Sequence, residues 1–202
     1  MIEASSCGRP TPPVLRTAHS LSCGQPTPCP ADSPLRVGRL HRALEQEFAA
    51  IPGMESAGLS LYIPLDGNVW SFDVILPGKP APGPHEDDVS LMNRVSPHFL
   101  DAVGQQVVRG RGLTEGDTES SRPVAVVNRA FVKKFFPKED PIGRHFADTD
   151  QEGRAFSEIV GVVADAKYTN PREAAQPMYF RPLSQWQRVK DPVAVAVETQ
   201  AH

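Results

Sequence analysis

The chain has 202 residues, of which 40% are hydrophobic and 22% charged, so it can bury one ordinary globular core or two small subdomains. Its 21 Lys and Arg against 24 Asp and Glu give a formal net charge of -3, and no basic run is long enough to neutralise a row of phosphates. Nucleic acid is therefore not an expected partner. The sequence contains no apolar run of the length that a membrane helix needs, and no secretory signal follows Met1.

Residues 1–34 differ in composition from the rest of the chain. They contain seven prolines and no apolar periodicity, which predicts a disordered Pro-rich tail. The three cysteines, Cys7, Cys23 and Cys29, all lie in this tail, at spacings that match no familiar zinc arrangement. The sequence therefore predicts free thiols without a metal, and a folded domain at 35–202.

An amphipathic helix opens the folded part, because apolar residues from Val37 to Ile51 recur at steps of three and four. Pro52-Gly53 ends this helix, since proline lacks the N–H and glycine accepts a left-handed exit. The next expected elements are a strand at Met54–Ile63, a strand at Val69–Leu76, a surface loop at Pro77–Asp88 and a strand at Val89–Val95.

Ser96-Pro97 is expected to open a short helix, with the serine as N-cap, which Gly104 closes. Asn128 is placed to cap a helix at Arg129–Phe136. Further strands are expected at Gln105–Gly112, Pro123–Val127, Ser157–Ala164, Met178–Arg181 and Val193–Val197, and turns at Thr114–Asp117 and Asp140–His145. Strands and helices mix without strict βαβ repetition, which predicts an α+β fold rather than a doubly wound sheet.

The usual catalytic signatures for nucleotides, hydrolysis and proteolysis are absent. The run His85-Glu86-Asp87-Asp88 has the composition of a weak metal site, but a charged run in a Pro/Gly loop is usually solvated. Lys133-Lys134 is expected to be the solvent face of its helix rather than a lipid contact. Acid–base catalysis by a pair of carboxylates would require some of the following residues to lie close together in the fold: Asp117, Glu119, Asp148, Asp150 and Glu152. Nothing in the sequence predicts that convergence, so we expect no catalytic residue, no cofactor and no metal.

Several blocks follow one another in an order that is more specific than any single block. They are Ala50–Ala57 (AIPGMESA), Arg94–Leu100 (RVSPHFL), Val108–Thr114 (VRGRGLT), Pro123–Asn128 (PVAVVN), Phe135–Arg144 (FFPKEDPIGR), Glu158–Asp165 (EIVGVVAD) and Pro177–Leu183 (PMYFRPL). This series, over about residues 36–198, resembles the MacB-like periplasmic core domain of the MacB/FtsX-type ABC transporter permease family, and most of all its duplicated orphaned permeases.

The resemblance implies two packed subdomains, one a βαβ-type unit and one mainly β, carried between two membrane helices at the extracytoplasmic face of the cell membrane. It implies as partners the transmembrane helices of an FtsX-like permease and a separate cytoplasmic ATPase, and it leaves a homodimer open. The domain would pass ATPase-driven movement to a substrate or partner as a rigid body, without catalysis. Relative to the family, this chain lacks the flanking membrane helices and ends soon after Val193–Val197, so we expect a C-terminally truncated copy.

Other interpretations stay open at this point. One is a stand-alone extracytoplasmic binding or adaptor module, with the Pro-rich tail as tether and Pro77–Asp88 as contact surface. A second is a non-functional gene fragment. A third is an enzyme without short motifs, suggested only by the carboxylates and by His145 near Asp148, which requires a concave pocket with convergent titratable groups. The permease-domain interpretation requires Val124–Val127 and Ile159–Val163 to lie in sheets of one α+β core.

Overall fold

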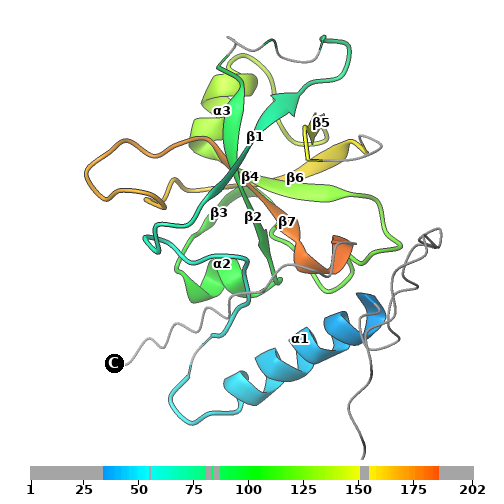
Figure 1. Cartoon of the computed structure of the whole chain (residues 1–202), viewed down its shortest axis with the longest axis vertical. Coiled ribbons are helices and arrows are strands. Elements are labelled where there is room, and N and C mark those ends of the chain that lie inside the picture. Colours follow the sequence, from blue (N-terminus) through cyan, green and yellow to red (C-terminus); the bar gives the residue numbers. More distant parts are fainter. Residues whose placement is uncertain (1–33, 55, 81–82, 84–86, 151–154, 187–202) are drawn as a thin grey trace, which may run out of the picture.

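The computed structural model describes residues 34–54, 56–80, 83, 87–150 and 155–186 (Figure 1). Its elements are α1 (Pro34–Ala49), β1 (Trp70–Ile75), β2 (Val89–Val95), α2 (Phe99–Ala102), β3 (Val107–Gly110), β4 (Val124–Asn128), α3 (Arg129–Phe135), β5 (His145–Asp148), β6 (Ser157–Val163), β7 (Met178–Pro182) and the 3-10 helix η2 (Leu183–Gln185). None of these helices has the length and apolar character needed to cross a membrane. The expected tail, with its three cysteines, and the expected strand at Val193–Val197 lie outside the described residues, except that Pro34 begins α1.

Six strands of the sheet close into a ring. The strand order is β3-β6-β4-β7-β2-β1-β5, and β5 pairs with β6 as well as with β1. At the closing seam His145 pairs with Glu158 and Phe146 with Ser157. Each of the six strands therefore has a neighbour on both sides, whereas β3 pairs only with β6 among the described strands.

β4, α3 and β6 form the βαβ-type unit that the resemblance implied. β4 and β6 are parallel, and α3 contacts β4, β6 and β7. The β-branched runs Val124–Val127 and Ile159–Val163 therefore lie in one sheet, as the permease-domain interpretation required. The other strands continue this sheet, which confirms the α+β class. The expected division into two packed subdomains stays a prediction.

The core lies inside the ring, where aromatic side chains from several elements meet. Phe131 of α3, Phe146 of β5 and Tyr179 of β7 are all fully buried. The ring centroids of Phe131 and Phe146 are 5.1 Å apart, and those of Phe146 and Tyr179 are 5.0 Å apart. Offset and edge-on aromatic contacts of this kind stabilise a core beyond the apolar area that they bury.

Asn128 holds the start of α3, as its sequence position predicted. Its Oδ1 accepts hydrogen bonds from the backbone N–H of Phe131 at 2.8 Å and of Met178 at 3.0 Å. Its Nδ2 donates to the carbonyl of Gln176 at 2.8 Å. One side chain thus caps the helix and also fixes the start of the neighbouring strand β7.

The expected strand at Met54–Ile63 is wrong. Among the described residues of this segment, only Ser60 forms a ladder contact, an isolated bridge to Val95. The segment runs beside β2 but is bound to it partly by side chains, since the N–H of Leu61 donates to Asn93 Oδ1 at 3.2 Å as well as to the backbone of β2. Side-chain acceptors that take backbone hydrogen bonds interrupt a regular ladder, so the alternation of apolar residues is present without a strand.

Two further details of the prediction are wrong. Ser96 does not cap α2, because its hydroxyl accepts the N–H of Leu59 at 2.8 Å, and the N-cap position is held by His98 without a side-chain bond. The expected turn at Asp140–His145 is followed by a strand, β5, that the sequence analysis missed. The other strands expected within the described residues and the helix after Asn128 are confirmed with small shifts at their ends. The described residues of Pro77–Asp88 contain no helix or strand.

Two glycines allow β3 to cross β6 at close range. Gly110 has φ +70°, and a Cβ at this position would lie 2.3 Å from the carbonyl oxygen of Val160. A Cβ on Gly161 would lie 1.9 Å from the carbonyl oxygen of Arg111. Since no real Cβ tolerates such distances, these two positions require glycine for the backbones to approach.

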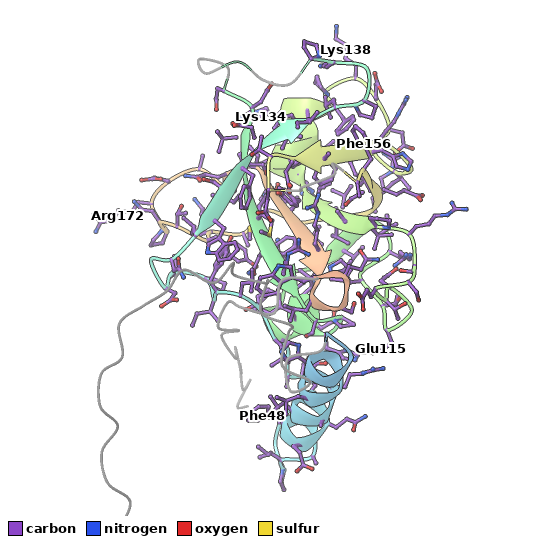
Figure 2. The ribbon with its side chains drawn as sticks, turned by 45° about the vertical axis from the view of Figure 1, so that its right-hand side comes forward. Phe48, Glu115, Lys134, Lys138, Phe156 and Arg172 are labelled. Atoms are coloured by element: carbon purple, nitrogen blue, oxygen red, sulfur yellow. The ribbon has the colours of Figure 1, made fainter. Side chains whose placement is uncertain are left out.

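α1 lies at one end of the molecule and makes few contacts with the sheet (Figures 1 and 2). The periodic pattern identified the helix, but its apolar side chains are only partly covered: Leu40 is 58% exposed, while Phe48 is half-buried. The most buried of its described side chains is Glu45, at 8% exposure. Burial raises the pKa of Glu45, and a hydrogen bond with Ser96 opposes that shift.

Candidate functional site

The carboxylates considered in the sequence have different partners among the described residues, since Asp117 is bound by Arg111 whereas Asp148 and Asp150 both act on the charge of Arg94. Asp117 accepts two hydrogen bonds from the guanidinium of Arg111, at 2.8 and 2.9 Å, and one from the N–H of Thr114 at 2.8 Å. Burial would raise the pKa of Asp117, but these bonds to Arg111 and Thr114 outweigh it and hold the pKa below its ordinary value. Asp117 therefore fixes the turn after β3, as the predicted turn at Thr114–Asp117 requires.

Asp148 belongs to a buried ion cluster that the sequence analysis did not detect. Its Oδ2 lies 2.8 Å from Nη1 of Arg181 and accepts a hydrogen bond from the hydroxyl group of Tyr179. Asp148 is fully buried, and the side chain of Arg181 is 3% exposed. The guanidinium of Arg181 also lies over the rings of Phe146 and Tyr179, at 5.7 and 5.2 Å from their centroids. β5 and β7 are thus joined by a charge pair inside the ring.

A second arginine lies beside this pair. Arg94 of β2 is in register with Arg181 of β7, so the two side chains lie next to each other on parallel strands. The pKa of Arg94 is lowered to about 10, chiefly because burial disfavours the charged form and also because Arg181 repels it, while Asp150 and Asp148 act in the opposite direction. Its guanidinium lies 5.6 Å from the ring centroid of Trp186.

No group of three or more His, Cys, Asp or Glu side chains in the described part of the chain is arranged to hold a metal ion. His145 is exposed at the start of β5 whereas Asp148 is buried at its end, so they do not form the pair that the enzyme hypothesis suggested. Of the run His85-Glu86-Asp87-Asp88, the first two residues lie outside the described part. Asp87 instead accepts a bond from Nζ of Lys134 at 3.0 Å.

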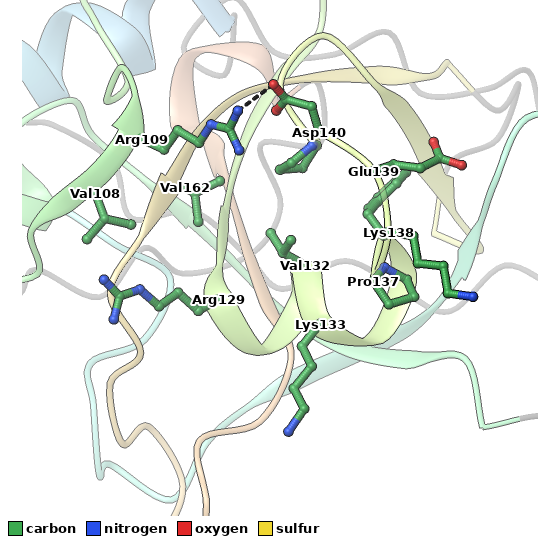
Figure 3. A pocket seen from close by; sticks show the side chains of 12 residues that line it. Val108, Arg109, Arg129, Val132, Lys133, Pro137, Lys138, Glu139, Asp140 and Val162 are labelled. Carbon is green, nitrogen blue, oxygen red and sulfur yellow. Dashed lines mark hydrogen bonds and ion pairs between the residues drawn. The ribbon is translucent and has the colours of Figure 1, made fainter.

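One concave feature of the described surface is a groove of about 850 Å³ between α3 and β3, which we call the α3–β3 groove (Figure 3). It is lined by residues of β3, α3, the turn after α3 and β6. They are Val108, Arg109, Arg129, Val132, Lys133, Phe136, Pro137, Lys138, Glu139, Asp140, Pro141 and Val162. The sequence analysis did not single out this region as a site, because its residues come from segments that are distant in the chain.

The anionic side chains of the groove are already paired. Asp140 Oδ2 lies 2.5 Å from Nη2 of Arg109, and Glu139 Oε2 lies 3.0 Å from Nη2 of Arg144. The remaining cationic side chains that line the groove have no anionic partner within salt-bridge distance among the described residues: Arg129, Lys133 and Lys138. The groove is thus cationic although the chain as a whole has a formal net charge of -3.

The two lysines that were expected to face solvent differ from each other. Lys133 is exposed at the groove, as expected, and Figure 3 shows its side chain extended away from the ribbon. Lys134 instead binds the loop before β2 through Asp87 and the carbonyl of Val89, each at 3.0 Å. Only Lys133 of this pair is therefore available to a partner.

The lining residues offer charged and apolar groups for binding. None of them is Ser, Thr, Cys, His or Tyr, and both carboxylates are held by arginines. The apolar residues and the unpaired cations can contact a ligand with apolar and anionic groups.

Comparison with known proteins finds the same family that the sequence blocks resemble, and a solved structure with a similar fold. The sequence model of the MacB-like periplasmic core domain family matches residues 67–202. No curated protein sequence matches the chain significantly. Among solved structures, the periplasmic region of MacB from Actinobacillus actinomycetemcomitans is similar over 80% of this chain, with 15% identity and a TM-score of 0.54. The chain spans 66% of that structure, and at this identity the likeness shows the fold alone.

Two further structures resemble the chain at lower scores. The extracellular domain of the noncanonic ABC-type transporter YknZ from Gram-positive bacteria has 17% identity and a TM-score of 0.48, over 77% of this chain and 71% of its own. A domain of a putative permease protein from Porphyromonas gingivalis has 16% identity and a TM-score of 0.47, over 74% of this chain and 58% of its own. The family match covers more than half of the sequence, and the chain therefore belongs to the family of MacB-like periplasmic core domains.

Proposed function

We propose that the chain is the extracytoplasmic domain of an ABC transporter permease and that it transmits ATPase-driven movement to a substrate or partner without catalysing a reaction. The observation that carries this proposal is the family match over residues 67–202, within which the ring of strands lies. The proposed partners are the transmembrane helices of an FtsX-like permease and a separate cytoplasmic ATPase. The proposed location is the extracytoplasmic face of the cell membrane.

The architecture of the ring supports a mechanical role. A closed sheet cannot lengthen or shear without breaking hydrogen bonds between several strands at once, because each strand is bound on both sides. The buried pair of Asp148 and Arg181 joins β5 to β7 across the interior, and aromatic contacts fill the remaining space. A force applied at one end is therefore passed to the other end by rotation or translation of the whole body.

The first test recovers the complete gene. The DNA on both sides of the reading frame is sequenced and translated for apolar stretches of about 20 residues, the length of a membrane helix. Stretches on both sides support the permease domain. A complete frame without them contradicts it and favours a stand-alone extracytoplasmic module, while stop codons within the matched region favour a non-functional gene fragment.

The second test measures movement in the complete permease, reconstituted in lipid nanodiscs with its ATPase. Spin labels are placed at Glu115 and Lys138, two exposed residues that lie far apart along the vertical direction of Figure 2. The distance between these two labels should stay the same with and without ATP. The distance from Glu115 to a label at the membrane end of the adjoining helix should change. A change within the domain, or no change relative to the membrane, contradicts rigid-body transmission.

A further inference from the structure

We propose that the α3–β3 groove binds an acidic, partly apolar segment of a partner protein. The proposal goes beyond the permease role and does not depend on it, since it rests on the shape and charge of a surface that can be measured without a membrane or an ATPase.

The floor of the groove is apolar and accessible. Arg129 lies three positions before Val132 and four before Lys133, so these residues of α3 are turned toward the groove, and Phe136 lines it directly after the helix. On this face Val132 is half-buried, and across the groove Val108 of β3 is 41% exposed. Figure 3 shows Val132 near the middle of the labelled lining residues, with Val108 to one side of it. An apolar side chain of a partner segment would therefore be removed from water on both sides.

The rim of the groove selects for negative charge. Four cationic and two anionic side chains line it, and both anions already have arginine partners. The remaining cations, Arg129, Lys133 and Lys138, lie on different sides of Val132 (Figure 3). Although the chain has a formal net charge of -3, such a cationic concavity attracts an acidic segment.

A protein segment fits these observations better than a lipid surface. Polybasic binding to anionic lipid headgroups uses clusters of about four to eight Lys or Arg on a face that can lie flat against a bilayer. Here the unpaired cations are fewer, and they surround a concavity whose apolar residues a flat bilayer does not reach. A single extended segment with alternating acidic and apolar side chains satisfies both the rim and the floor.

The groove is a better docking place than the edge of β3. All four residues of β3 are exposed, and in the described sheet this strand pairs only with β6. Its register shifts between Val107 and Arg109, however, and a bulge of this kind on an edge strand disfavours regular pairing with an added strand. Recognition through side chains in the groove is therefore favoured over extension of the sheet.

The experiment uses the complete 202-residue chain and a fluorescein-labelled peptide of Asp-Val-Glu-Leu repeats, with binding followed by fluorescence anisotropy. We expect a Kd of about 1 mM or tighter at low ionic strength, which weakens as salt is raised from about 0.05 to 0.5 M. The double variant Arg129→Glu/Lys133→Glu should bind the peptide at least about tenfold more weakly, because each reversal removes an attraction and adds a repulsion.

The matched control is Lys79→Glu/Arg172→Glu, which makes the same change of net charge at two exposed residues that do not line the groove. It should bind within about twofold of the unchanged chain. A third variant, Val108→Ser, tests the floor and should weaken binding while leaving the salt dependence unchanged. Near-UV circular dichroism shows that each variant keeps its packing.

Equal weakening in both double variants would mean that only the overall charge matters, and it would overturn the proposal. Absence of peptide binding at about 1 mM would also overturn it, and groove-dependent binding to phosphatidylglycerol vesicles would then assign the surface to lipid. Sedimentation that shows a dimer in the unchanged chain and a monomer in the Arg129→Glu/Lys133→Glu variant would assign the groove to a second copy. None of these results bears on ATP-driven movement, so this proposal and the permease role fail separately.

Discussion

Removal of the carboxylate of Asp148 should destabilise the fold far more than removal of a surface carboxylate. In the Asp148→Asn variant the guanidinium of Arg181, 3% exposed, loses its ion-pair partner while Arg94 still repels it. Breaking a buried pair from one side costs about 3–5 kcal/mol, because the remaining charge stays buried without compensation. With a urea m-value of about 2 kcal/mol/M, the unfolding midpoint should fall by about 2 M.

The matched control is Glu139→Gln, which removes the partner of Arg144 in an ion pair whose side chains are more than half exposed. Such pairs contribute about 0–1 kcal/mol, so the urea midpoint should move by less than about 0.5 M. The double variant Asp148→Asn/Arg181→Met removes both buried charges and should cost much less than the sum of the two single variants. Urea unfolding followed by Trp fluorescence measures the free energy of unfolding of the unchanged chain and of each variant, the single variant Arg181→Met included. Similar losses in Asp148→Asn and Glu139→Gln, or an additive double variant, would refute the assignment of a compensated buried pair.

Three further substitutions test local contacts by thermal and urea unfolding. Gly161→Ala should lower the free energy of unfolding by more than about 2 kcal/mol, because the new Cβ would lie 1.9 Å from the carbonyl oxygen of Arg111. Gly112→Ala should be nearly neutral, because its Cβ would meet only a side-chain carbon at 3.6 Å. Equal effects would contradict the close approach of β3 and β6. Asn128→Ala should cost about 2 kcal/mol because it removes the helix cap and the acceptor for Met178 N–H, and an unchanged midpoint would contradict that role. Glu45→Gln should stabilise the chain at pH 7, because burial raises the pKa of Glu45 and disfavours its ionised form. That gain should disappear as the pH falls below 4.5, the ordinary value, where Glu45 is protonated in both states, and a gain that persisted there would have another cause.

The elements that local chemistry specifies could be predicted from the sequence. The run Val124–Val127 followed by Asn128 predicted a buried strand and a capped helix, because β-branched residues favour strands and the asparagine side chain accepts backbone N–H groups at a helix start. Gly104 ends α2 with φ +65°, as its position after the short helix indicated. In each case a few neighbouring residues carry the whole signal.

The segments that were predicted wrongly depend on contacts with distant residues. Met54–Ile63 has the alternation of a strand, yet Asn93 and Ser96 take its backbone hydrogen bonds. The ion cluster was missed for the same reason, since Asp148 and Arg181 are more than thirty residues apart and only the closure of the ring brings them together. The α3–β3 groove likewise requires β3 and α3 to meet across β6, which no local pattern indicates.

The contact between α1 and the ring decides how movement could enter this domain. α1 is the first described helix, and its contacts with other described elements are concentrated on η2, while Glu45 reaches Ser96 at the end of β2. η2 follows β7 directly, and β7 carries Arg181 of the buried cluster. A displacement of α1 would therefore press on β2 and β7, the two parallel strands that hold Arg94 and Arg181 in register. Under the proposed mechanical role, the cluster and the closed sheet resist local deformation, and the displacement would be passed to the opposite end, where α3 and the groove lie.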